Sequence, residues 1–354
     1  MVNTRTQSNM WLLNLLHTLI NTVLSYIHLA QNGEIGWQTV NRKAGQPLFI
    51  LYRSFTGHYM REPQPLKKKL KLILLFNPLT EWIDTAHFMR LYMHNSALRA
   101  GAHERSKASR KQIAGFVSAY NINMADFAPA DIDAYSTFED FFTRAHAPGS
   151  RPIADPQNNS RAVCVADARV VVYPSVEETR RLWIKGADFS IAQLLMDNQL
   201  GAQFDGAAVA SFRLSPLDYH RYHSPVSGKV KLFRSMPGDY YDVDPWALQS
   251  DVDILTRNAR QYVVIETNEF GDVLFVAIGA SDVGSVRIHN EWQKPGAHIN
   301  KGDELGRFQF GGSSIIVAFE HGRMTFDEDL LSVSRRQIMM DVEVGMSLGT
   351  ATNP

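Results

Sequence analysis

The second half of the chain alternates short strand-like runs with turn residues, and this pattern restricts the fold more than any other feature. The runs are rich in β-branched and aromatic residues and are separated by Gly, Pro and Asp, which is typical of antiparallel strands. The predicted strands cover residues 163–173, 208–214, 228–233, 261–266, 273–278, 284–288 and 315–319. One helix over residues 191–200 is expected to interrupt them. The sequence therefore predicts a mainly antiparallel β core.

The residues before this core follow a helical pattern instead. From Thr80 to about Arg144 the periodicity is mostly helical, and the turn-rich segment 147–159 then marks a boundary. We predict an α+β fold in which a helical N-terminal region is followed by the β core. The predicted division places a helical region that could associate with a membrane at 1–146, and a β-rich core at 147–354.

Composition excludes some classes of function. The 36 basic residues balance the 36 acidic ones, so no overall field attracts nucleic acid, and no nucleic-acid partner is expected. Cys164 is the single cysteine of the chain and therefore cannot form an internal disulfide. The valines around it indicate a small apolar residue in a strand.

The first region contains two segments with membrane-binding character. Met10–Ala30 carries no charged residue, and its polar residues recur at helical spacing, which indicates an amphipathic helix with a broad apolar face. Such a helix could lie in a membrane interface, pair with another helix, or be buried in a domain. In the second segment, lysines at 67–69 and 71 precede the apolar run 72–76. This segment fits an anionic lipid surface, and it equally fits a helix with a solvated lysine face.

The sequence Phe310-Gly311-Gly312-Ser313-Ser314 stands directly before the predicted strand 315–319. Glycines give the backbone unusual freedom, and Ser313 places a hydroxyl beside the carbonyl of Gly312. Attack by this hydroxyl would convert the peptide bond into an ester. β-Elimination at that ester would then cut the chain, and hydrolysis of the resulting dehydroalanine would leave a pyruvoyl group. The alternative is an ordinary Gly-Ser turn.

Several further motifs occur in order with this one, and together they resemble the phosphatidylserine decarboxylase family. The segments that carry the resemblance are 138–144 (FEDFFTR), 166–170 (ADARV), 184–186 (IKG), 218–228 (DYHRYHSPVSG), 236–238 (MPG), 283–286 (VGSV) and 301–314 (KGDELGRFQFGGSS). The resemblance extends from about Phe138 to Phe319.

The resemblance implies a self-cleaving proenzyme that carries a covalent pyruvoyl group derived from Ser313. Cleavage between Gly312 and Ser313 would give two chains, α and β, from one precursor. The family's autocatalytic triad of Asp, His and Ser falls on Asp167, His223 and Ser313, with His223 as the base. The first histidine of the motif, His220, is the candidate proton donor in decarboxylation. The substrate amine would react through a Schiff base, and phosphatidylserine would become phosphatidylethanolamine.

His220 and His223 are three residues apart, and histidines at this spacing can bind zinc. No cysteine or third histidine clusters with them, and Pro225 breaks a helix there, so no metal is expected. The resemblance implies a phospholipid substrate, and peripheral or interfacial association with a membrane fits it. A homodimer is also compatible with the sequence.

The sequence departs from the family pattern at three places, and the last of them bears on the substrate. Ala168 stands where a glycine is usual, and Ser314 where a threonine is common. Asp242 and Asp244 replace a serine and an asparagine, and their charges would repel a phosphate if they face the site. A pyruvoyl-dependent decarboxylase of a free, aromatic or other, amino acid is therefore an alternative. An uncleaved lipid-binding homologue without activity is another.

Overall fold

The computed structural model describes most of the second half of the chain and parts of the first. The described residues are 39–42, 101–182, 190–215, 217–239, 241, 243, 248, 253–280, 285–309 and 313–352. The two segments predicted to bind membranes, 10–30 and 67–76, lie outside the described residues, as do Gly312, Asp242 and Asp244. No helix within the described ranges is both long and apolar enough to cross a membrane.

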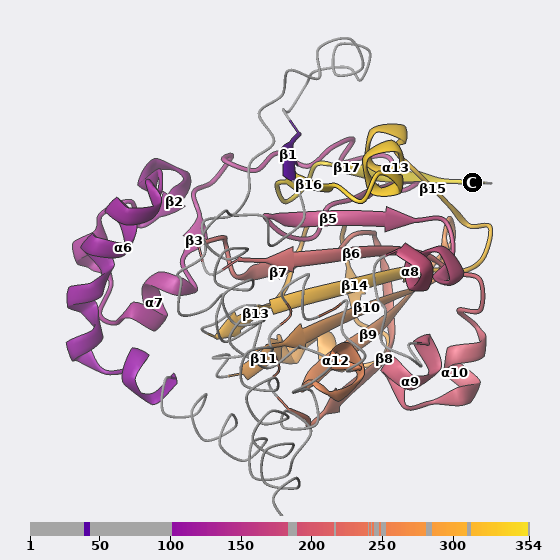
Figure 1. The fold of residues 1–354 in the computed structure, drawn as a ribbon, viewed down its shortest axis with the longest axis horizontal. Coiled ribbons are helices and arrows are strands. Elements are labelled where there is room, and N and C mark those ends of the chain that lie inside the picture. Colours follow the sequence, from indigo (N-terminus) through magenta and orange to yellow (C-terminus); the bar gives the residue numbers. More distant parts are fainter. Residues whose placement is uncertain are drawn as a thin grey trace, which may run out of the picture.

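A nine-stranded sheet forms the centre of the molecule (Figure 1). Its strand order is β1-β16-β5-β6-β14-β10-β9-β8-β12, and all neighbours are antiparallel except β1 and β16. The strands are β1 (Thr39–Asn41), β5 (Ala168–Tyr173), β6 (Ala208–Leu214), β8 (Gly228–Met236), β9 (Arg260–Thr267), β10 (Gly271–Gly279), β12 (His298–Ile299), β14 (Ser313–Phe319) and β16 (Met339–Val342). The prediction of an α+β fold with a mainly antiparallel sheet is confirmed.

A three-stranded antiparallel sheet covers one face of the large sheet. It contains β11 (Ser285–Ile288), β13 (Glu304–Gln309) and β7 (Arg221–His223), in that order. The side chains of Tyr222 and Phe308 are fully buried in one apolar cluster with Phe275 and Ile315 of the large sheet. Because side chains alternate between the faces of a strand, the neighbours of Tyr222 point away from this core.

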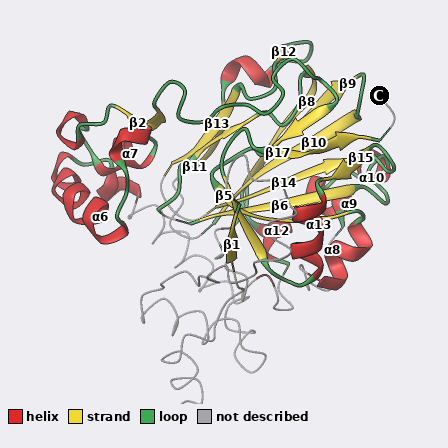
Figure 2. Ribbon diagram, turned by 90° about the horizontal axis from the view of Figure 1, so that it is seen from above, coloured by secondary structure: helices red, strands yellow, loops and turns green. Residues whose placement is uncertain are grey.

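Four short helices cover the opposite face of the large sheet. These are α8 (Val176–Leu182), α9 (Ile191–Leu195), α10 (Asn198–Ala202) and α12 (Ile254–Arg257). Figure 2 shows α8, α9 and α12 on the side of the sheet away from β11 and β13. Leu194 and Leu255 of these helices share a second buried cluster with Val276 and Ile316. The central strands of the large sheet, such as β6 and β14, are therefore buried on both faces and read as mostly apolar runs.

The single helix predicted over residues 191–200 is wrong, because two helices occupy this region. Met196 has the left-handed conformation (φ 50°), which ends α9. The side chain of Asp197 then accepts a hydrogen bond from the backbone N–H of Leu200 and caps α10. The apolar periodicity continues across the break, so the pattern alone predicted one helix.

The described part of the N-terminal region forms a small helical unit around phenylalanines. It comprises η1 (Lys107–Gln112), α6 (Ile113–Tyr120), η2 (Met124–Asp126), β2 (Phe127–Ala128), η3 (Ile132–Ala134), α7 (Phe138–Phe142) and β3 (Ala145–His146). Phe138, Phe141 and Phe142 are buried together in this unit. Strand β3 pairs with β2 and ends at the predicted division between 1–146 and 147–354, which stays a prediction.

The C-terminal residues complete the fold beside β5. A third sheet has the order β15 (Met324–Phe326), β17 (Ser347–Ala351) and β4 (Arg161–Val163). Helix α13 (Glu328–Arg335) places Leu330 in the first buried cluster. Arg42, directly after β1, forms ion pairs with Asp327 (2.9 Å) and Asp329 (2.7 Å) and so ties the edge strand to this region. The remaining element is η4 (Asn290–Gln293), between β11 and β12.

Candidate active site

Ser313 is the first residue of β14, in the middle of the large sheet. It pairs with Leu214 of β6 on one side and with Gly279 of β10 on the other. The residue is fully buried, and its Oγ has no hydrogen-bond partner within the described part of the chain. Buried hydroxyls are normally satisfied, and an orphaned one requires an explanation. Gly279 contributes no side chain, so β10 leaves room opposite the hydroxyl.

The two neighbouring serines face opposite sides of the sheet. Ser314 Oγ donates to the carbonyl oxygen of Phe212 (3.0 Å), as a structural hydroxyl does. Ser313 shares its face with Ile315 and Val317, which belong to the core beneath β7 and β13. Ser313 is therefore on the side of the sheet where the histidine-bearing segment lies.

Asp167 and Ser313 lie at the same end of the large sheet, where β5 and β14 begin. The β5–β6 and β6–β14 pairings bring the starts of β5 and β14 to either side of the end of β6. Asp167 immediately precedes β5, so it lies two strands, or about 10 Å, from Ser313. Its carboxylate accepts hydrogen bonds from Arg151 (Nη2–Oδ2, 2.8 Å) and from the backbone N–H of Val344 (2.9 Å). His146 Nε2 is 3.3 Å from Oδ2.

The Asp167 carboxyl is held in its ionised form. Burial acts to raise its pKa, but hydrogen bonds and charge from His146 and Arg151 outweigh burial and lower the pKa to about 2. A permanent negative charge therefore lies at the end of the large sheet where β14 begins with Ser313. This charge favours any nearby imidazole that takes up a proton.

His220 follows the loop that leaves the end of β6. Its ring is fully buried and packs on Phe142 of α7, with ring centroids 3.9 Å apart. Nδ1 lies 2.8 Å from the carbonyl oxygen of Asp218, which can only accept, so Nδ1 carries the proton and Nε2 is the acceptor nitrogen. The backbone carbonyl of His220 accepts from the N–H of Phe308 (2.9 Å), on the strand that leads to Ser313.

His223 is the last residue of β7, and its side chain points to the face of that strand opposite Tyr222. Its Nδ1 donates to the carbonyl oxygen of Gly302 (2.8 Å), and Tyr219 Oη donates to its Nε2 (3.1 Å). Burial, the largest influence, lowers the pKa of His223, so the imidazole is neutral at pH 7. In register, His223 pairs with Glu304, whereas His220 contacts Phe308, nearer to Ser313 along β13.

The strand pairings bring Asp167 and Ser313 to one end of the large sheet, and the loop that carries His220 leaves β6 at the same end. The hydrogen bond expected between Asp167 and His223 is not formed among the contacts described for these two residues. A chain of contacts connects them instead. Asp167 contacts His146, the His146 ring lies against Tyr219 with centroids 3.7 Å apart, and Tyr219 bonds His223. Asp167 still acts electrostatically on His223.

Sequence reasoning missed the residues that link Asp167 to His223. Tyr219 lies within the DYHRYH motif, directly before His220, so the motif itself was an available signal. His146 ends β3 and Arg151 lies in the turn-rich segment that follows, and only the folded chain brings them to Asp167. Within the described ranges, no cluster of three or more His, Cys, Asp or Glu residues could hold a metal ion.

Comparison with known proteins establishes the family. The model of the family described as phosphatidylserine decarboxylase matches residues 138–350. The chain is similar to phosphatidylserine decarboxylase proenzyme 2 of Oryza sativa (41% identity, 76% of this chain, 43% of the relative). It is also similar to a protein of that name from Komagataella phaffii (36% identity, 83% of this chain, 29% of the relative). A phosphatidylserine decarboxylase proenzyme of Chlamydia trachomatis is 35% identical over 70% of this chain and 80% of its own length.

These matches define the class as that of decarboxylases made as proenzymes. The chain belongs to the phosphatidylserine decarboxylase family, as the resemblance of the motifs predicted. It spans less than half the length of the rice and Komagataella relatives.

Proposed function

We propose that this chain is a phosphatidylserine decarboxylase proenzyme that cuts itself between Gly312 and Ser313. The observation that supports this most directly is Ser313 itself. A fully buried hydroxyl with no partner in the described part of the chain stands at the first residue of a central strand. The ionised Asp167 carboxylate lies at the same end of the large sheet.

In the proposed maturation, Ser313 Oγ attacks the carbonyl carbon of Gly312 while its proton passes to a base. The C–N bond of the peptide then breaks, and Gly312 is held by an ester. Removal of the α-proton of residue 313 expels the Gly312 carboxylate and leaves a dehydroalanine. Water then replaces the nitrogen, which leaves as ammonia. His223 is the proposed base, because its Nε2 lone pair is fixed by the Nδ1–Gly302 hydrogen bond.

Asp167 is the proposed orienting charge in this step. Because its carboxyl stays ionised, it stabilises the imidazolium that forms when the base takes up the serine proton. The contacts through His146 and Tyr219 give it a path to His223. The Tyr219 hydroxyl must turn away from Nε2 for the base to accept that proton.

The pyruvoyl group derived from Ser313 would supply an electrophilic carbonyl that takes up the electron pair released with CO2. The surroundings of Ser313 fit this group, since the serine is excluded from water and its partner on the β10 side, Gly279, has no side chain. His220 is the proposed donor of the proton that replaces CO2: its Nε2, the acceptor nitrogen, would first take up a proton from the ammonium group of the substrate and then pass it on. Phe142 packs on its ring and restricts its orientation.

The proposed substrate is phosphatidylserine, and the proposed product is phosphatidylethanolamine. The names of the relatives support this assignment. The amphipathic segment 10–30 and the lysines at 67–71 support association with a membrane surface, where such a substrate resides. A phospholipid is therefore the proposed partner, and the two chains of the mature enzyme are proposed to derive from this one precursor.

Intact-mass measurement on the purified protein tests the proposal. We expect fragments 1–312 and 313–354, the second lighter by one ammonia than a fragment beginning with serine. Ser313→Ala protein should remain one uncut chain and should not convert phosphatidylserine in mixed micelles. A wild-type protein that stays intact, or a Ser313→Ala protein that is cut at this site, would refute the self-cleavage mechanism.

A further inference from the structure

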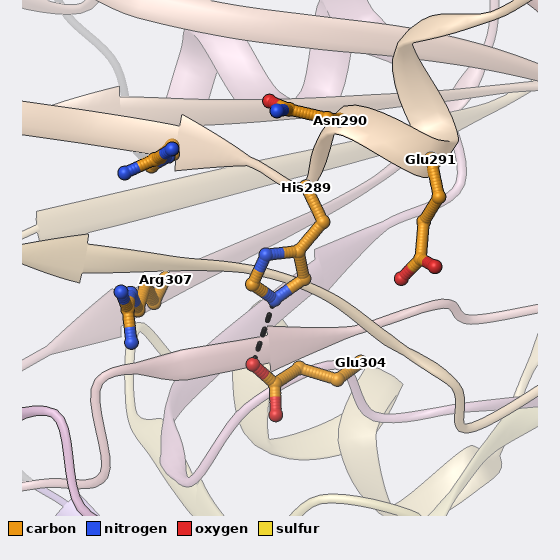
Figure 3. Close-up of a pocket in the computed structure, with 6 residues that line it drawn as sticks. His289, Asn290, Glu291, Glu304 and Arg307 are labelled. Atoms are coloured by element: carbon orange, nitrogen blue, oxygen red, sulfur yellow. Dashed lines mark hydrogen bonds and ion pairs between the residues drawn. The ribbon is translucent and has the colours of Figure 1, made fainter.

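A polar cavity lies outside the Ser313 centre, on the small sheet (Figure 3). Its volume is about 530 Å³. The residues that line it come from β11, β13 and η4, and they are Arg287, His289, Asn290, Glu291, Glu304 and Arg307. Arg307 alternates along β13 with Phe308, which is buried against the large sheet. The cavity therefore opens on the face of the small sheet opposite the core that contains Ser313.

Three arginines cross this face in register. Arg287 of β11 is directly opposite Arg307 of β13, and Arg307 is directly opposite Arg221 of β7. Like charges directly opposite each other on a sheet destabilise the pairing. The arrangement therefore indicates that negative charge is supplied at this face.

The described residues supply only part of that charge. Arg221 is neutralised locally, because its Nη1 donates to Glu304 Oε2 at 2.9 Å. The side chains of Arg287 and Arg307 form no hydrogen bond or ion pair with any residue in the described ranges, and among those residues the buried Arg307 Nε has no partner. Glu139 of α7 lies within electrostatic range of Arg307 but makes no contact of ion-pair length with it among the described residues.

The opposite wall of the cavity carries a carboxylate. His289 Nε2 bonds Glu304 Oε1 at 2.7 Å, which holds the imidazole in the middle of the cavity. Figure 3 shows Arg307 on one side of this ring and the Glu291 carboxylate on the other. Glu291 is exposed and forms no ion pair with a described residue. Two cationic groups without partners thus lie across the cavity from one anionic group.

We propose that this cavity binds the headgroup of an aminophospholipid, at a site separate from the Ser313 centre. Arg287 and Arg307 bind the phosphodiester, because guanidinium groups match the geometry of phosphate oxygens. Glu291 binds the ammonium group. This inference rests on the proposed function only for the choice of lipid.

The soluble probe for this site is glycerophosphoethanolamine, which carries both charged groups but no acyl chain and no carboxylate to lose. Isothermal titration calorimetry with the purified full chain at low salt should detect its binding. Arg287→Gln and Arg307→Gln should each weaken binding at least about tenfold, since each removes charge-assisted hydrogen bonds. Glu291→Gln should weaken binding of this probe but not of inorganic phosphate.

Arg234→Gln is the matched control, because Arg234 is an exposed arginine on β8 of the other sheet. The affinity of the Arg234→Gln variant for glycerophosphoethanolamine should equal that of wild type. Binding that survives the Arg287→Gln/Arg307→Gln double substitution, or that falls equally in Arg234→Gln, would overturn the site. Inorganic phosphate binding as tightly as the probe, with no effect of Glu291→Gln, would overturn the assignment to an aminophospholipid.

Two further measurements separate this site from the proposed function. Ser313→Ala protein should bind the probe like wild type, because the cavity does not depend on maturation. Failure of the chain to cleave itself would refute the proposed function and leave the cavity assignment in place. Vesicles of phosphatidylethanolamine and phosphatidylcholine distinguish a lipid from a free phosphodiester: cosedimentation that requires Arg287 and Arg307 supports a lipid headgroup. Vesicle binding unchanged in the double substitution would overturn it.

Discussion

At the scale of single residues, the two histidines of the DYHRYH motif differ in their surroundings. His220 is buried against Phe142, with Nδ1 held by Asp218. His223 is held by Gly302 and Tyr219 and senses the charge of Asp167. Both rings are fixed with Nε2 as the acceptor nitrogen, so each can move a proton, but they contact different parts of the molecule.

We predict that substitution separates the two histidines by stage. His223→Ala should slow self-cleavage at least about a hundredfold, because removing a general base typically costs that much. His220→Ala should still be cut but should lose decarboxylation. Gel analysis of each purified variant, with CO2 release measured on the cleaved fraction, tests this. Full activity of cleaved His220→Ala protein would remove His220 from the chemistry.

The pH dependence of stability should report His223. Burial lowers its folded-state pKa below the ordinary 6.5, so the unfolded chain takes up the proton first as the pH falls. Stability is therefore complete above about pH 6.5 and decreases below it, by about 1.4 kcal/mol for each unit by which the pKa is lowered. Thermal unfolding between pH 5 and 8 should show a smaller decrease for His223→Gln.

Asp167 should act in a different pH window. Its folded-state pKa of about 2 is below the ordinary value of an aspartate, so its contribution is complete above about pH 4 and is lost as the pH falls through 2. An Asp167→Asn variant should therefore be less stable than wild type by a constant amount between pH 7 and 8, above the range in which His223, on which the Asp167 charge acts, takes up a proton. A difference that changes within this range would contradict the assigned ionisation.

At the scale of elements, Lys301 organises the loop that carries Gly302. Its Nζ donates to three backbone carbonyls, those of Asp155 (2.7 Å), Asn158 (2.9 Å) and Arg161 (3.1 Å). The side chain is buried, with the residue 7% exposed. Because the next residue, Gly302, holds His223 Nδ1, the position of this loop affects the proposed base.

We predict that Lys301→Met lowers the free energy of unfolding by about 2–3 kcal/mol, since three buried carbonyls lose a charged donor. Cleavage should also slow, because Gly302 no longer holds His223 in place. Urea unfolding and the rate of fragment formation measure the two effects. Lys294→Met is the control, because Lys294 is exposed and its side chain holds no backbone carbonyl among the described residues. Equal stability of the two variants would contradict the prediction.

The strands most accessible to sequence reasoning were those buried on both faces. β6, β10 and β14 are runs of mostly apolar residues; β6 has its predicted bounds, and β10 and β14 differ from their predicted ranges by at most two residues at an end. The sequence did not predict β7 or β13, because in both charged residues alternate with aromatic ones and glycine interrupts β13. In the small sheet β13 lies between β7 and β11, and this pairing is determined by the tertiary fold.

The same distinction applies to the site. The motifs identified Asp167, His220, His223 and Ser313, and pairing of strands brings Asp167 and Ser313 to one edge. The contacts of Asp167 with His146 and Arg151 could not be predicted, because no pattern in the sequence pairs these two residues with Asp167 and they meet it only in the folded chain. Local sequence indicates chemistry, whereas partners depend on the path of the chain.

At the scale of the whole molecule, the proposed cut falls beside the centre of the fold. The fragment from Ser313 to Pro354 would supply β14, β15, α13, β16 and β17. β14 is hydrogen-bonded to β6 along one side and to β10 along the other, and all its residues are buried.

We predict that the two fragments of the mature protein stay associated without a covalent bond. Each large apolar side chain of β14 that became exposed would cost about 1.5–3 kcal/mol, and separation would expose several, together with unpaired strand edges. Gel filtration in native buffer should elute both fragments together, at the volume of uncut Ser313→Ala protein. The fragments should separate only in denaturant. Free release of the C-terminal fragment in native buffer would contradict the central position of β14 in the mature protein.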